Sequence, residues 1–97
     1  MPIFAFIGRD GPGGAALRKT HRPAHLAGLE GLERERRIRH AGPLLDESGT
    51  PVGSLILFEA DSLELAREAA SRDPYVTQGV FTSYDVHETK VVFPASP

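Results

Sequence analysis

The chain has 97 residues, of which 40% are hydrophobic and 25% charged, with a net charge of −2. This length suits one domain over residues 1–97, and the slight negative charge argues against nucleic acid as a partner, because such proteins carry a broad positive field. The absence of cysteine excludes disulfides, thiolate nucleophiles and iron–sulfur or Cys-type zinc sites.

The first element expected is a strand, because Ile3–Ile7 is a continuous apolar run that ends at Gly8. A run that is apolar at every position is typical of a strand buried on both faces. The run is too short for a membrane span, and no positive residues precede it as they do in a signal peptide. We therefore expect a cytoplasmic protein without a membrane partner.

Residues 9–19 are predicted to form a flexible loop, because Gly11-Pro12-Gly13-Gly14 lies at their centre. The loop lacks the Gly-Lys-Ser/Thr ending of a phosphate-binding loop and the GxGxxG spacing of a dinucleotide turn. Phosphate binding is therefore not predicted for it.

A helix is predicted over about 20–37, with Pro23 in its first turn, where the missing N–H has no partner to lose. His25, Leu29 and Leu32 follow at spacings of four and three, so they share one stripe of the helix with Leu26 beside them. This stripe should face the core, which would turn His25 inward.

This helix contains two glycines, and a mixed set of charges runs along it and into the segment that follows. Gly28 and Gly31 each weaken a helix by roughly 1 kcal/mol relative to Ala, which suggests that another element packs closely against them. Charges of both signs favour a solvated face over a nucleic-acid patch. They are Glu30, Glu33, Arg34, Glu35, Arg36, Arg37 and Arg39.

Two further strands are predicted at 38–45 and 52–59, joined by a polar connection over 46–51. Pro43 cannot donate to a sheet ladder, so the earlier of the two strands should lie at a sheet edge or contain a bulge. Both faces of the later strand are apolar, so both should be covered.

A second helix begins at Asp61-Ser62-Leu63-Glu64, which has the form of a capping box with Asp61 as the N-cap. We expect it to end near Arg72, with Asp73-Pro74-Tyr75 turning the chain out of it. Gly79 supplies the turn into a last strand over about 80–92. The inner stripe of this helix comprises Leu63, Ala66, Ala69 and Ala70.

The predicted order β-α-β-β-α-β defines an α+β fold of the ferredoxin-like, split βαβ kind. Its four-stranded antiparallel sheet has the first and third strands at the centre and two helices on one face. The other face would expose aliphatic side chains, at about 1.5–3 kcal/mol each. A second sheet could bury them, so we expect a homodimer through this open face.

The chain has four histidines, which are candidates for metal binding or acid/base catalysis. His21 and His25 are four apart, a spacing by which helical side chains can share a metal ion, but only remote residues such as His40 or Asp73 could supply a third ligand. His40 and His87 lie on predicted strands and are interpreted as surface or interface residues. No metal and no cofactor is predicted.

His25 and Asp73 form the strongest pair, although each has a purely structural interpretation. His25 could be a core histidine whose hydrogen bonds are satisfied, and Asp73 could be the turn residue that commonly precedes proline. If the two side chains meet, Asp73 would set the tautomer of the His25 imidazole and orient it as a general acid/base. Spacing alone does not fix their distance.

Several motifs in order give the chain a specific resemblance. From about residue 3 to 93 it resembles the YciI-like (YCII-related) proteins. The motifs are Arg22-Pro23-Ala24-His25-Leu26, Ala41-Gly42-Pro43, Gly53-Ser54, Phe58-Glu59, Asp61-Ser62-Leu63-Glu64, Asp73-Pro74-Tyr75 and Gly79-Val80.

The resemblance implies a dimeric α/β barrel with a site made from His25 and Asp73. It also implies that Gly42, Pro43 and Ser54 line the same pocket. Most proteins of this kind have no assigned reaction, and one branch removes hydrogen chloride from a chlorinated, hydroxylated aromatic. The Gly-rich segment 10–16 departs from the pattern and is expected to reshape the pocket mouth.

The leading interpretation is a cofactor-independent enzyme of isomerase, lyase or dehydrochlorinase type that acts on a small cyclic, oxygenated substrate. His25 would move a proton, Asp73 would orient it, and Arg22, Ser54 and Tyr75 would hold polar groups of the substrate. The alternative is a non-catalytic module that binds a small ligand in the same pocket. Haem or metal binding through His25 is a third interpretation, weakened by the lack of convergent ligands.

Overall fold

The computed structural model describes residues 1–95. Within this range the chain forms four strands and three helices. In chain order they are β1 (Ile3–Asp10), α1 (Gly14–Arg34), β2 (Ile38–Leu45), β3 (Pro51–Glu59), α2 (Leu63–Ser71), α3 (Pro74–Thr77) and β4 (Phe81–Thr89).

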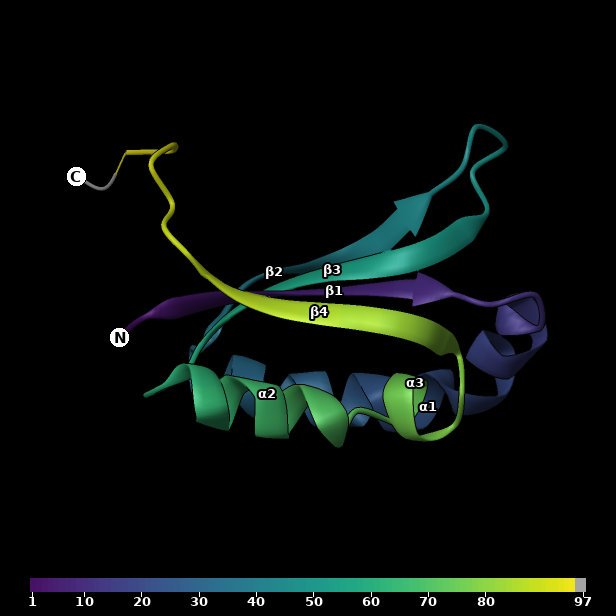
Figure 1. Cartoon of the computed structure of the whole chain (residues 1–97), viewed down its shortest axis with the longest axis horizontal. Helices are drawn as coiled ribbons and strands as arrows, with labels where there is room; N and C mark the ends of the chain where they lie inside the picture. The colour runs from purple at the N-terminus through teal and green to yellow at the C-terminus, as the bar shows by residue number, and fades with distance from the viewer. Residues whose placement is uncertain (96–97) are drawn as a thin grey trace.

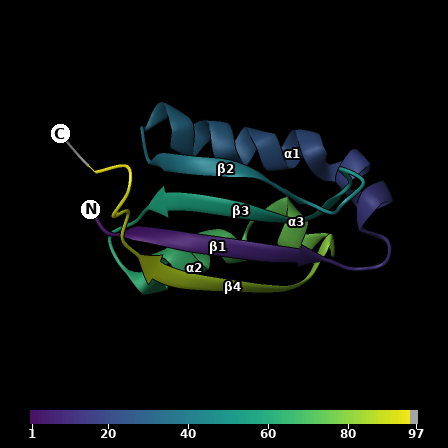
Figure 2. The same cartoon turned by 90° about the horizontal axis from the view of Figure 1, so that it is seen from above.

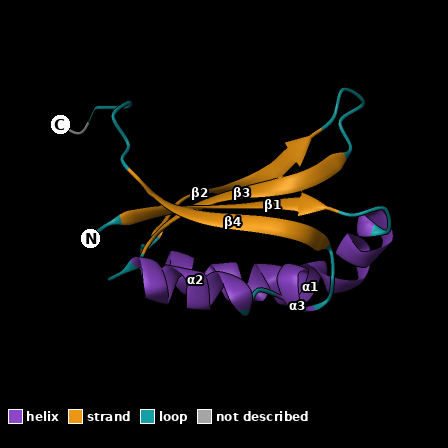
Figure 3. Cartoon of the chain, in the orientation of Figure 1, coloured by secondary structure: helices purple, strands orange, loops and turns teal. Residues whose placement is uncertain are grey.

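The strands form one antiparallel sheet in the order β2-β3-β1-β4 (Figure 2). β1 and β3 are therefore central and β2 and β4 are edges, which confirms the predicted ferredoxin-like α+β topology. Pro43 lies on the edge strand β2, opposite Ser54, where its missing N–H breaks no central ladder. The helices all cover the same face of the sheet, so the molecule has two layers (Figures 1 and 3).

The core lies between these layers and follows the alternation of the central strands. Phe4 and Phe6 of β1 and Ile56 and Phe58 of β3 are buried and occupy opposed positions in the ladder. In alternation with these core residues, Ile3, Ile7, Leu55 and Leu57 point to the opposite face and are half-buried. Among the described residues no helix covers that second face, which we call the open face.

The predicted loop over residues 9–19 is wrong. β1 continues to Asp10, and α1 starts at Gly14, inside the glycine run. Gly14 permits a close approach, because a Cβ there would lie 2.7 Å from Asp10 Oδ2. Only residues 11–13 connect β1 to α1, so the segment 10–16 is not an inserted loop. Pro23 lies inside α1 rather than in its first turn.

Several element ends also differ from the sequence expectation. α1 ends at Arg34, before the predicted end near residue 37. The helix stops there because Arg36 adopts a left-handed φ of 59° and Arg37 N–H donates back to Leu32 O. Ser62 rather than Asp61 caps α2, since its hydroxyl accepts from Leu65 N–H. β4 ends at Thr89 instead of near Val92.

The expected close packing on Gly28 and Gly31 is also wrong, because a Cβ at either position would meet nothing within 4 Å. Gly28→Ala and Gly31→Ala should therefore each raise the free energy of unfolding by about 0.5–1 kcal/mol, because Ala loses less backbone entropy in a helix. Urea denaturation measures the change. Gly53→Ala is the contrasting variant, expected to lose about 1–3 kcal/mol, because its Cβ would lie 2.5 Å from Gly8 O. Destabilisation by Gly28→Ala would contradict the structure.

Candidate active site

The side chains of His25 and Asp73 meet under the sheet. His25 Nδ1 lies 2.8 Å from Asp73 Oδ1, and the two side chains are only 7% and 10% exposed. Asp73 Oδ1 also accepts a hydrogen bond from Tyr75 N–H at 2.8 Å. The structure thus brings together two residues that are 48 positions apart in the chain.

Local sequence explains how each side chain is held. His25 lies on the inner stripe of α1, above Leu29, as the periodicity predicts. Asp73 is the N-cap of α3, and Pro74 suits the first helical position because it has no N–H to satisfy. Asp-Pro-Tyr therefore does more than the predicted turn, since it starts a short helix that packs on α1.

The Tyr75 ring packs against one face of the His25 imidazole. The His25 and Tyr75 rings stack with their centroids 3.8 Å apart and an angle of 6° between their planes. Together with Asp73, this stack leaves His25 little rotational freedom.

The contact between His25 Nδ1 and Asp73 Oδ1 selects one tautomer of the neutral imidazole when Asp73 is ionised. An ionised carboxylate only accepts hydrogen bonds, so His25 Nδ1 carries the proton that it donates to Asp73. In the neutral imidazole Nε2 is then an acceptor, and no described residue occupies it. The arrangement can take a proton at Nε2 while Asp73 stabilises the resulting imidazolium.

A cavity of about 400 Å³ adjoins His25 between α1 and the β2–β3 side of the sheet. The structure places all five residues singled out as substrate-binding candidates on its lining: Arg22, Gly42, Pro43, Ser54 and Tyr75. Leu26, Leu29 and Ile56 add apolar surface. The cavity therefore combines an apolar wall with a few polar groups, as small-molecule sites commonly do.

Sequence reasoning missed Arg18, which lines this cavity, and Asp10, which binds Arg18 from outside the lining. Arg18 donates from Nε to Asp10 Oδ2 at 2.6 Å and from Nη2 to Asp10 Oδ1 at 2.9 Å. The same Nη2 lies 2.7 Å from Gly53 O and 3.0 Å from Ser54 Oγ. Both residues fell in the segment expected to be a loop. The sequence signal for this ion pair was weak. It consisted of an Asp at the end of a strand and an Arg eight positions later, near the start of a helix.

Burial raises the pKa of the Tyr75 phenol above its usual value of 10.0, and the charges of Asp73 and Asp10 add to this against the opposing charges of Arg18 and Arg22. The unfolded chain then releases this proton at a lower pH than the folded protein does. The free energy of unfolding should therefore fall as pH rises above about 10. Urea denaturation at several alkaline pH values measures the slope. Tyr75→Phe should reduce it and Tyr84→Phe, at an exposed tyrosine, should not; an equal slope in Tyr75→Phe would contradict the prediction.

The other histidines stand apart from this pair. His40 lies at the open face, His87 is exposed on β4, and His21 does not line the cavity. Over residues 1–95, no three His, Asp or Glu side chains gather in a way that could hold a metal ion. None of the helices in that range has the length and apolar character that crossing a membrane requires.

The fold and the site define a class: a ferredoxin-like α+β domain with a buried histidine–aspartate pair beside a cavity of about 400 Å³. The chain belongs to the YCII-related family, whose domain model matches residues 3–90. It is 36% identical to Protein YciI of Escherichia coli O6:H1 over 97 aligned residues, covering 94% of this chain and 99% of that protein. It is 32% identical to an uncharacterized protein of Haemophilus influenzae, covering 93% and 98% of the two chains.

Solved structures show the same fold. The 5-chloro-2-hydroxyhydroquinone dehydrochlorinase TftG of Burkholderia phenoliruptrix AC1100, in complex with 2,5-dihydroxybenzoquinone, superposes with a TM-score of 0.80. It is 29% identical, with 91% of this chain and 93% of that chain covered. Rv0793 of Mycobacterium tuberculosis, 13% identical with a TM-score of 0.51 over 99% of this chain and 100% of that one, shares the fold alone.

Proposed function

We propose that this protein is a cofactor-independent enzyme that transfers a proton on a small cyclic, oxygenated substrate, with His25 as the base. The observation that carries the proposal is the 2.8 Å contact between His25 Nδ1 and Asp73 Oδ1. This contact engages Nδ1 and leaves Nε2 free of Asp73, on a residue that lines the cavity. A histidine oriented in this way by a carboxylate is the usual arrangement of a general base.

The chemical step follows from these positions. Nε2 takes a proton from the substrate, and the electron pair left behind forms a new double bond in the substrate. In an isomerisation the imidazolium returns the proton to another atom, and in a dehydrochlorination the electron pair expels chloride. Asp73 stabilises the imidazolium in both cases, while the Ser54 and Tyr75 hydroxyls can bind substrate oxygens.

The dehydrochlorinase activity of TftG supports the elimination form of this proposal. The test incubates the full chain with 5-chloro-2-hydroxyhydroquinone and measures chloride release, and it measures 2,5-dihydroxybenzoquinone binding by titration. Chloride release above the spontaneous rate supports an enzyme of this type. Binding of 2,5-dihydroxybenzoquinone without release of chloride counts against this elimination and favours a ligand-binding module.

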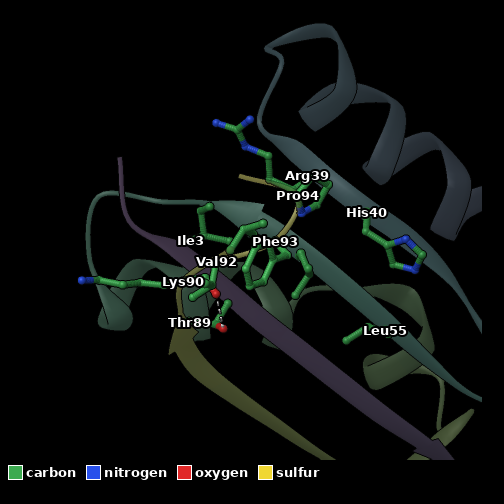
Figure 4. A pocket seen from close by; sticks show the side chains of 11 residues that line it. Ile3, Arg39, His40, Leu55, Thr89, Lys90, Val92, Phe93 and Pro94 are labelled. Atoms are coloured by element: carbon green, nitrogen blue, oxygen red, sulfur yellow. Dashed lines mark hydrogen bonds between the residues drawn. The ribbon is translucent and has the colours of Figure 1, made fainter. Parts of the chain in front are cut away.

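We further infer that the open face associates with a second copy of the chain. Half-buried aliphatic side chains cover its centre, and the C-terminal residues 91–94 lie beside it (Figure 4). Val92 and Phe93 are 67% and 83% exposed, an unusual environment for such side chains. Pairing of two such faces would bury this apolar surface and close the sheets into a barrel-like dimer.

Leu57→Lys should weaken this association, because it places a charge at the centre of the open face. We expect the native chain to sediment as a dimer and the variant to shift toward the monomer. Analytical ultracentrifugation over a range of concentrations measures both. Leu65→Lys is the matched control, since Leu65 is 47% exposed on α2, in the helix layer. A native chain that remains monomeric at every concentration would refute the inference.

A further inference from the structure

The charges around the His25 cavity are unbalanced. Arg18, Lys19 and Arg22 line it from α1, and no acidic residue is among its described lining residues. Arg18 is neutralised by its two hydrogen bonds to Asp10. Lys19 and Arg22 form no ion pair with any acid within residues 1–95. The cavity mouth therefore carries two uncompensated positive charges.

The spacing of α1 explains why a positive charge faces the cavity. Arg18, Arg22, His25 and Leu29 follow at intervals of four, three and four, so they form one stripe of the helix. Along this stripe the lining changes from cationic to imidazole to apolar. A ligand that bridges Arg22 and Leu29 therefore lies beside His25.

The neutral polar groups of the cavity add hydrogen-bond donors. Tyr75 is 2% exposed, and its hydroxyl has no hydrogen-bond partner in the part of the chain that the structure describes. Ser54 Oγ accepts from Arg18, which leaves its own proton free to donate. His25 Nε2 adds an acceptor to these donors. Such a set of side chains suits a ligand rich in negatively charged oxygen.

We propose that the cavity selects small anionic ring compounds, bearing a carboxylate or an ionised enol or phenol, and that Arg22 determines this charge specificity. This inference deepens the proposed function and rests on the same cavity. A guanidinium binds a carboxylate through two parallel hydrogen bonds. The ring then lies along the apolar wall formed by Leu26, Leu29 and Ile56, beside His25. The positive charge also stabilises the additional negative charge that proton removal creates.

The test compares two ligands that differ mainly in charge. Salicylate is anionic at about pH 7, whereas salicylamide has nearly the same shape without the carboxylate. Binding of each to the full chain is measured by NMR titration, observing the His25 imidazole resonances. We expect salicylate to bind at least about tenfold more tightly than salicylamide. Equal binding, or no salicylate-dependent shift of the His25 resonances at millimolar concentration, would overturn the proposal.

Variants assign the preference to Arg22. Arg22→Met should reduce the ratio of the two affinities to near one, and Arg22→Lys should retain most of it. Arg34→Met, at an exposed arginine in the last turn of the same helix, should leave the ratio within about twofold of the native one. An Arg22→Met variant that keeps the native preference would overturn the assignment.

The same titration separates this inference from the proposed reaction. His25→Asn removes Nε2 but leaves the cationic residues in place. The variant should therefore keep the charge preference, read from Tyr75 resonances, although it has lost the base. Anion preference without chloride release from 5-chloro-2-hydroxyhydroquinone would count against the proposed elimination and leave this inference intact. Chloride release together with equal affinity for salicylate and salicylamide would support the proposed reaction and overturn this inference.

Discussion

His25→Asn is expected to lower the turnover of a substrate processed by this protein by about 10²–10⁴-fold, the usual contribution of a general base. The Asn amide can donate to Asp73 from about the position of Nδ1, so the variant removes Nε2 without leaving Asp73 unpaired. Its free energy of unfolding should consequently change far less than its activity. Steady-state kinetics and urea denaturation of the same preparation measure both.

Matched variants assign this effect to the histidine–aspartate pair. His21→Asn, one turn earlier on α1 and outside the cavity lining, should retain native activity. Asp73→Asn keeps an N-cap for α3 but loses the charge that stabilises the imidazolium, so its activity should also fall. Native turnover in either His25→Asn or Asp73→Asn would remove that residue from the mechanism.

Arg18→Met should lower the free energy of unfolding by about 3–5 kcal/mol. This is the largest loss expected among the variants proposed for this protein. The Arg18 and Asp10 side chains are 12% and 6% exposed, so the variant leaves a carboxylate buried without its counter-charge. Gly53 O and Ser54 Oγ lose a donor at the same time. Urea denaturation measures the loss.

A double-mutant cycle distinguishes the ion pair from simple packing. Asp10→Asn combined with Arg18→Met should be less destabilising than the sum of the two single variants, because no buried charge then remains unpaired. Arg9→Met, at the exposed neighbour of Asp10, should change stability by less than about 0.5 kcal/mol. Additive losses in the double variant would show that the two side chains act independently.

Much of the fold could be predicted because its signals are local. The continuous apolar run Ile3–Ile7 indicated a central strand, and Pro43 indicated an edge strand, since each pattern reflects how the backbone and side chains of one segment meet their surroundings. The connection after β1 could not be predicted in this way. Gly11–Gly14 has a loop composition, yet α1 begins at Gly14, where the backbone lies close against the Asp10 side chain.

The sequence by itself determined the topology, the inward face of α1 that carries His25, and the family. Each of these depends on periodicity or on motifs that can be read within a short window. Only the tertiary structure decided that Asp73 reaches His25, that Tyr75 stacks on the imidazole, and that Arg18 joins Asp10 to the β3 strand. These contacts join residues from separate segments, and their distances depend on how the helices pack on the sheet, which no local pattern encodes.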